Sequence, residues 1–207
     1  MLLTRKLTRE LSDGYSIVVE RRFEVQFVPQ GAGFKVRGEQ VASKVEAPPN
    51  LAAFAKIEQQ RIETSLFPLE LDRTGLIRSG AIQASQPALD QAVQLALEQV
   101  KAMPLTTGEK DEARAFLNGL ERAADKISSQ PPVDLFTPPL TAAAVTHEAA
   151  LPDGLLGHIT THFSGSVSSA TGLLEQAERI VSTEAAGTRR RTLEHWSLMA
   201  LPGNRIS

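Results

Sequence analysis

Two histidines that stand four residues apart, His158 and His162, are the residues most suggestive of metal chemistry. On an α-helix this spacing would bring both imidazoles onto one metal ion. The intervening Ile-Thr-Thr favours a strand, in which four residues span about 13 Å. The pair then cannot chelate one ion, and His147 and Glu148 would add a ligand only if another element approached. We therefore expect no metal and no cofactor. A hydrolase or metal-dependent enzyme that uses His158 or His162 is kept as an alternative.

A stretch rich in glycine and serine, residues 165–172, resembles a phosphate loop or a serine-nucleophile turn only superficially. It lacks the Lys-Ser/Thr ending of the former and the Gly-x-Ser-x-Gly pattern of the latter. A nucleophilic Ser166 or Ser168 would also need a histidine base and an orienting acid. We interpret residues 164–172 as a flexible connector, and we assign no catalytic residues.

Arg189, Arg190 and Arg191 form a compact basic run. In a strand these side chains alternate between two faces, so at most two of them act together. We expect a solvated hairpin end beside Glu184 and Glu178. The only tryptophan, Trp196, is expected in the core or in the wall of a ligand site.

Composition excludes several classes of function. The 207 residues contain no cysteine, which excludes disulfides, thiol nucleophiles and thiolate metal sites. A formal net charge of −2 gives no basic field for nucleic acid. No run of about 18 apolar residues predicts a transmembrane helix, and the charged start of the chain does not read as a secretory signal. We expect a soluble chain, cytoplasmic if Met1 is native and periplasmic if a leader was removed.

The first 46 residues predict an antiparallel meander. Apolar side chains alternate from Tyr15 to Phe27, with Arg21 as the one charged member of that face. Turn residues flank this long strand on both sides. In the following strand the apolar side chains occupy even-numbered positions up to Val36 and odd-numbered positions from Val41. This change predicts a β-bulge near Gly38.

Helices are expected in the middle of the chain. Pro48-Pro49 ends the meander, and an apolar stripe predicts a helix over residues 51–66 that lies on the sheet. A short hairpin follows at residues 67–77. Two further stripes between residues 85 and 129 predict an antiparallel helical pair, and four prolines then predict an extended connector anchored by Phe136.

The last strands form a hairpin whose register can be predicted from charge. A two-residue loop at Ala186-Gly187 places Glu184 opposite Arg189, Arg179 opposite Glu194 and Ala177 opposite Trp196. A shift by one residue would place Glu178 opposite Glu194, and like charges directly opposite each other are unfavourable. The first register is therefore preferred.

These elements predict an α+β fold. A curved antiparallel sheet, or half-barrel, forms from the N- and C-terminal strands, with one helix packed on it and an inserted helical pair. We expect one domain over residues 1–207, with four parts. They are the meander, helix and hairpin at 1–82, the helical pair at 83–130, the Pro-rich link at 131–145 and the C-terminal strands at 146–207.

The order of these elements resembles the bacterial lipoprotein-carrier (LolA-like) superfamily and bacterial envelope proteins of similar layout. The resemblance rests on the meander from Leu2 to Val45, the helix at 51–66, the hairpin at 67–77 and the closing hairpin that ends in Trp196-Ser197-Leu198. It covers about two-thirds of the chain and includes no diagnostic motif. It implies a half-barrel that encloses an apolar ligand.

Three functions remain open from the sequence. The leading hypothesis is a non-enzymatic protein that binds an apolar small molecule or lipid, with Phe23, Val25, Phe27, Phe54 and Trp196 as the ligand-binding wall. The second is an interaction or scaffold protein of the cell envelope that binds a protein partner. The third is the histidine-dependent enzyme. We expect no nucleic-acid partner.

Overall fold

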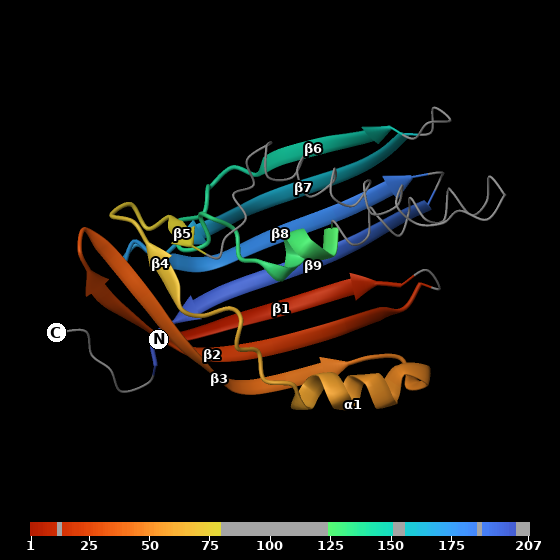
Figure 1. Cartoon of the computed structure of the whole chain (residues 1–207), viewed down its shortest axis with the longest axis horizontal. Helices are drawn as coiled ribbons and strands as arrows, with labels where there is room; N and C mark the ends of the chain where they lie inside the picture. The colour runs from red at the N-terminus through yellow and green to blue at the C-terminus, as the bar shows by residue number, and fades with distance from the viewer. Residues whose placement is uncertain (12–13, 80–123, 151–155, 186–187, 202–207) are drawn as a thin grey trace, which may run out of the picture.

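The computed structural model describes residues 1–11, 14–79, 124–150, 156–185 and 188–201. Nine strands of these residues form one antiparallel sheet in the order β5-β4-β3-β2-β1-β9-β8-β7-β6. The sheet curls into a half-barrel (Figure 1). The strands are β1 Leu2–Glu10, β2 Ser16–Gln30, β3 Gly33–Glu46, β4 Leu69–Leu71, β5 Ile77–Ser79, β6 Ala143–Ala150, β7 Leu156–Val167, β8 Leu174–Ala185 and β9 Thr188–Met199.

The first and last strands meet in the middle of the sheet. Leu3 of β1 lies opposite Phe23 of β2 on one side and Leu198 of β9 on the other. All three side chains are buried. The predicted curved sheet of N- and C-terminal strands is therefore confirmed.

The hairpin of β8 and β9 has the predicted register. Glu184 lies opposite Arg189, Arg179 opposite Glu194 and Ala177 opposite Trp196. Opposite charges thus face each other across the two strands, which favours this pairing over a slipped one.

The predicted bulge is present between β2 and β3. The pairing shifts between Arg22 and Phe23, which lie opposite Ala42 and Gln40, so that Val41 is the extra residue. Because a bulge changes which residues face inward, it explains why the apolar parity of β3 changes along the strand.

The predicted helix over residues 51–66 is shorter than expected. The α-helix α1 covers Ala52–Gln60 after a 3-10 turn at Pro49–Leu51, and the backbone is extended at Arg61. The amide of the Gln40 side chain donates to the carbonyl of Arg61 and its oxygen accepts from the N–H of Glu63. These bonds fix the extended segment beside β3 in place of a further helical turn.

No residue of α1 is buried, so the expectation that its apolar stripe faces the sheet is wrong. Phe54 and Ile57 are exposed, whereas Leu66, which follows the helix, belongs to the core. Helix α1 lies beside β3 at the edge of the sheet (Figure 1).

The short hairpin of β4 and β5 agrees with the prediction. Asp72 closes its turn, because one carboxylate oxygen accepts hydrogen bonds from Thr74 and from the N–H of Leu76. Gly75 has a φ of +86°, a conformation that glycine adopts easily. The hairpin continues the sheet beyond the first part of β3.

The predicted helical pair lies mostly outside the described residues, of which 124–129 are helical. The following segment, residues 130–142, is called here the strap. It contributes Leu135 and Phe136 to the core, which confirms Phe136 as its anchor. The predicted boundary at 145 is three residues too late, because β6 begins at Ala143.

The glycine- and serine-rich stretch also differs from its prediction. Its first residues, 164–167, belong to β7, and only 168–173 form the turn to β8. The alternation of serine with glycine and valine allows a strand, and these residues form one because they pair with β8.

Gly38 allows the ring of Phe67 to lie directly against β3. A Cβ at this position would be 2.5 Å from Cδ2 of that ring. We expect Gly38→Ala to lower the free energy of unfolding by about 1–3 kcal/mol, because the ring must shift within a packed core. Chemical denaturation measures this effect, with exposed Glu39→Ala as the control. Equal stabilities of the two variants would contradict the prediction.

Candidate functional site

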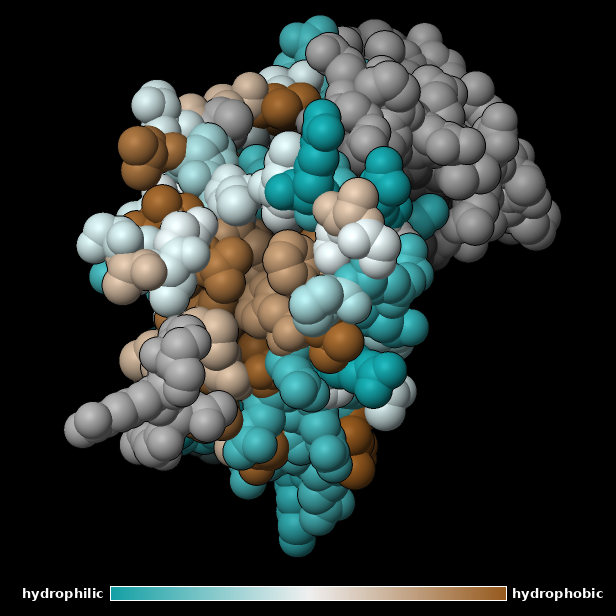
Figure 2. All heavy atoms as spheres, turned by 90° about the vertical axis from the view of Figure 1, so that its left-hand side faces the viewer, coloured by the Kyte–Doolittle hydropathy of each residue, from teal (hydrophilic) through white to brown (hydrophobic). Residues whose placement is uncertain are grey.

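The inner face of the half-barrel, which the strap covers, is the candidate functional site. Its apolar part is a continuous cluster from six strands of the sheet (β1, β2, β3, β7, β8 and β9), the β4–β5 hairpin, Leu66 and the strap. Seen from the end with the β2–β3 turn, apolar side chains gather in the middle of the molecule and polar ones surround them (Figure 2). The buried members are Leu3, Phe23, Val25, Val36, Leu66, Leu69, Leu71, Ile77, Leu135, Phe136, Phe163, Leu174, Ala177, Trp196 and Leu198.

Four of the five predicted wall residues come together on this face. Phe23, Val25 and Trp196 are buried in the cluster, and Phe27 packs against it. Phe54 does not join them, because it lies on α1 with 48% of its surface exposed. The predicted wall residues that reach the inner face therefore all come from strands.

The strap is the element that packs against this wall. The ring of Phe136 meets that of Phe27 edge to face, with 5.2 Å between centroids. Backbone hydrogen bonds hold the strap at three places: from Ile77 to the carbonyl of Val133, from Leu174 to that of Phe136 and from Gly165 to that of Pro139. Leu135 and Phe136 thus fill the space above the apolar wall.

A charged cluster of Arg5, Arg179 and Glu194, called here the arginine cluster, continues the inner face. Nε and Nη2 of Arg5 donate to Oε1 of Glu194, and Arg179 donates to Oε2. Arg5 also lies over the ring of Trp196, 4.9 Å from its centroid. One carboxylate therefore pairs with two guanidinium groups beside the only tryptophan.

Both arginines also hold the backbone at the end of the helical residues 124–129. Arg5 donates to the carbonyl of Ser128, and Arg179 donates to that of Gln130 at 2.7 Å. Carbonyls at the C-terminal end of a helix lack partners within it and carry partial negative charge. The arginine cluster satisfies these carbonyls and fixes the start of the strap.

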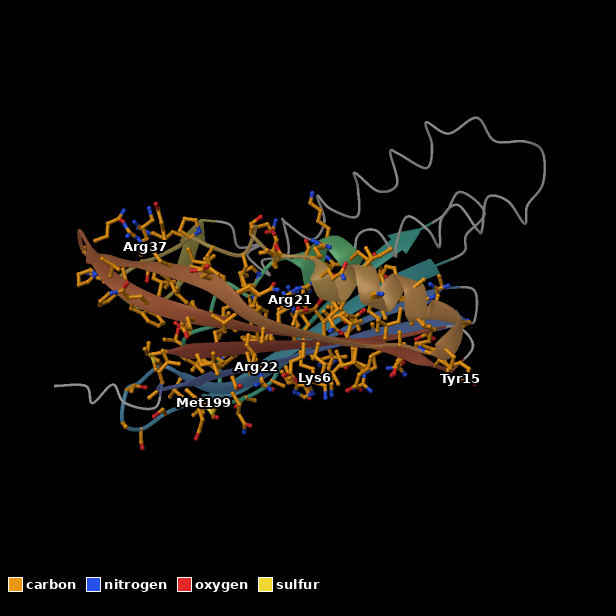
Figure 3. The ribbon with its side chains drawn as sticks, turned by 90° about the horizontal axis from the view of Figure 1, so that it is seen from below. Lys6, Tyr15, Arg21, Arg22, Arg37 and Met199 are labelled. Atoms are coloured by element: carbon orange, nitrogen blue, oxygen red, sulfur yellow. The ribbon has the colours of Figure 1, made fainter. Side chains whose placement is uncertain are left out.

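A further arginine, Arg21, lies opposite Arg5 on the neighbouring strand. It is buried and donates to Glu58 of α1 at 2.7 Å. Figure 3 shows Arg21 on the side of α1, and Arg22 and Lys6 on the opposite side of the sheet. The pair Arg21–Glu58 thus ties the otherwise exposed helix to the sheet.

Burial shifts two pKa values at this site. Loss of solvent lowers the pKa of Arg179, while Glu194 raises it and Arg5 lowers it further. Desolvation raises the pKa of Asp134 in the strap, against the attraction of Arg179. Burial therefore disfavours the charged form of Arg179 and the charged form of Asp134.

The raised pKa of Asp134 predicts the pH dependence of an Asp134→Asn variant. The ordinary value is 3.8. Below it, the carboxyl is protonated in both the folded and the unfolded chain. As the pH rises, the unfolded chain releases this proton first, so ionisation destabilises the fold. We expect Asp134→Asn to be more stable than the wild type at pH 7 and equal to it near pH 3, measured by thermal denaturation. A gain confined to acidic pH would contradict this.

The predicted histidine pair lies on the outer face of β7, away from the arginine cluster. Nδ1 of His158 is 3.8 Å from Glu148, whereas His147 points to the inner face and is buried. Among the described residues, no group of three acidic or histidine side chains is arranged to hold a metal ion. Because this segment is a strand, His158 and His162 do not come together as they would on a helix.

The other polar candidates also lie apart from the inner face. Ser166 donates to Glu175 at 3.1 Å, and Ser168 lies in the turn before β8, where its hydroxyl accepts from the N–H of Ala170. Arg189 and Arg190 are exposed near the end of the β8–β9 hairpin. Their placement agrees with a solvated hairpin end.

A pocket with a volume of about 630 Å³ lies on the outer face. Two neighbouring rows of polar side chains line it, including Lys6, Glu178 and His195. Its wide mouth and mixed charges give it no defined chemistry.

Sequence reasoning missed the arginine cluster as a site. Arg5, Arg179 and Glu194 lie on the same alternate positions as the apolar residues of their strands, and this pattern is the signal that could have revealed the cluster.

Among the described residues, no helix is long and apolar enough to cross a membrane. Comparison of the chain with models of known protein families and with curated proteins gave no match.

Proposed function

We propose that the protein is a non-enzymatic binding protein that holds an apolar or lipid-like ligand on the inner face of its half-barrel. The observation that carries this proposal is the pairing of a continuous apolar wall with a strap that, within the described part of the chain, packs against it as its cover. A closed sandwich would cover such a wall with a second sheet. Here an extended segment with two large apolar side chains does so.

A ligand that reaches Phe23 and Trp196 takes the place of Leu135 and Phe136. The strap is joined to the sheet by few backbone hydrogen bonds, and the apolar contacts that it loses are replaced by those of the ligand. Burial of an acyl chain supplies a driving force of about 0.8 kcal/mol for each methylene group. The half-barrel and the LolA-like resemblance support the same class of ligand.

Native mass spectrometry of protein purified from cells, together with displacement of a fluorescent fatty acid by dodecanol, tests this proposal. We expect either a copurified lipid or saturable probe binding that dodecanol reverses. Phe136→Ala, which shortens the side chain above the wall, should bind the probe more tightly, whereas Leu140→Ala in the exposed part of the strap should not. Absence of both a copurified lipid and probe binding would reject the proposal.

A protein-binding or scaffold function is the second candidate, and the exposed surface of α1 favours it. Phe54 and Ile57 of α1, and Ile62 shortly after it, are each about half exposed or more, and Val41 of β3 is exposed as well. Unpaired apolar side chains of this size are typical of interaction surfaces. A pull-down that compares the wild type with a Phe54→Ser, Ile57→Ser double variant tests it. We expect a bound protein to be depleted at least tenfold, and an unchanged partner list would count against this candidate.

A further inference from the structure

The arginine cluster buries more positive than negative charge. The side chains of Arg5, Arg179 and Glu194 are 12%, 5% and 0% exposed. Two guanidinium groups and one carboxylate leave an excess of one positive charge. A buried charge without a partner is strongly unfavourable, so a further negative group is expected nearby.

The neighbouring groups offset only part of this charge. The carbonyls of Ser128 and Gln130 contribute partial charges as hydrogen-bond acceptors. Asp134 attracts Arg179, but no ion pair joins the two within the described part of the chain. Glu58 already forms an ion pair with Arg21, and Asp125 forms one with Arg9, so neither carboxylate offsets the charge of the arginine cluster.

Two buried hydrogen-bond donors beside the cluster have no hydrogen-bond partner among the residues that the structure describes. They are Nε1 of Trp196 and the hydroxyl of Ser128, in side chains that are 1% and 2% exposed. Arg5 stacks on the ring of the first residue and donates to the backbone of the second. Nearly all buried polar groups in proteins have hydrogen-bond partners, and an indole N–H can only donate.

We propose that the arginine cluster binds the anionic head of the apolar ligand, a carboxylate, with Trp196 and Ser128 as additional donors. The inference rests on the proposed function. A single negative charge matches the excess of one, and planar guanidinium groups are suited to carboxylates. Leu3 precedes Arg5 by two residues on the same face of β1 and belongs to the apolar wall. A head at the arginines therefore leaves the acyl chain beside that wall.

Titrations that follow the fluorescence of Trp196, the only tryptophan, test this inference. The probes are dodecanoate, dodecanol and acetate, at pH 7 and constant ionic strength. We expect dodecanoate to bind at least tenfold more tightly than dodecanol, and acetate to compete with dodecanoate at high concentration.

Arg5→Met is the decisive variant, because it leaves Arg179 and Glu194 as a one-to-one pair. We expect it to lose the preference for dodecanoate while retaining dodecanol binding. Arg22→Met, an arginine of the outer face, is the matched control and should keep the preference. If Arg5→Met does not fold, Trp196→Phe removes the indole donor and retains a smaller aromatic ring, and calorimetry should show a preference for dodecanoate over dodecanol reduced by at least threefold.

The outcomes separate this inference from the proposed function. Equal affinity of the wild type for dodecanoate and dodecanol would overturn the carboxylate site while supporting an apolar ligand. Acetate binding that depends on Arg5, without binding of either twelve-carbon probe, would support the anion site and reject the apolar ligand. An undiminished preference in Arg5→Met or, where calorimetry is used, in Trp196→Phe would overturn the assignment to this cluster.

Discussion

Replacing Phe136 by alanine is expected to lower the free energy of unfolding by about 3–5 kcal/mol. The side chain is fully buried, and its ring meets that of Phe27 in an edge-to-face contact. Removal of the ring creates a cavity between the strap and the apolar wall, because the sheet on the opposite side cannot collapse into it. Urea denaturation measures the loss.

Leu140→Ala is the matched control for this prediction. Leu140 also belongs to the strap, but 81% of its surface is exposed. We expect its replacement to change the free energy of unfolding by less than about 0.5 kcal/mol. If both variants lost the same stability, Phe136 would not be the residue that anchors the strap.

Replacing Glu194 by glutamine should also cost about 3–5 kcal/mol, because it leaves two buried guanidinium groups without a carboxylate. Glu194 is fully buried and pairs with both Arg5 and Arg179. The shape of the side chain is retained, so loss of charge is the main change. Thermal and chemical denaturation measure the effect.

Glu178→Gln on the outer face of β8 is the control for Glu194→Gln. Its carboxylate lies 3.5 Å from His195, and both side chains are nearly half exposed. An exposed pair of this kind contributes about 0–1 kcal/mol. Similar losses in the two variants would show that Glu194 is not the essential counter-charge of the cluster.

The sequence contained the information that determines how the central strands pair. Opposite charges predict the register of β8 and β9, and the change of apolar parity in β3 predicts the bulge opposite β2. Both are local signals, in which one slipped residue would turn the side chains to the wrong face. The curved sheet follows from the same patterns.

The elements that cover the sheet were less predictable. The apolar spacing at residues 51–66 fits a helix, but hydrogen bonds from Gln40 to Arg61 and Glu63 replace its last turns. These contacts join residues more than twenty positions apart, so no local pattern reveals them. The first three residues of β6, 143–145, were assigned to the predicted link for the same reason, because they become part of a strand through pairing with β7.

The arginine cluster could be predicted only in part. The sequence placed Arg179 opposite Glu194, and this pair is present. It did not show that the pair faces inward, because charged residues in a strand usually face water. Recruitment of Arg5 and of the carbonyls of Ser128 and Gln130 depends on tertiary packing.

The most direct test of the central claim is to locate a bound ligand by photo-crosslinking. A fatty acid with a diazirine group near the end of its chain would be bound, irradiated and mapped by peptide mass spectrometry. We expect labels on the inner-face residues of β1 and β2 and on the strap around Phe136, and competition by dodecanoate should remove them. Labels confined to α1, around Phe54 and Ile57, or to the outer face would contradict the account.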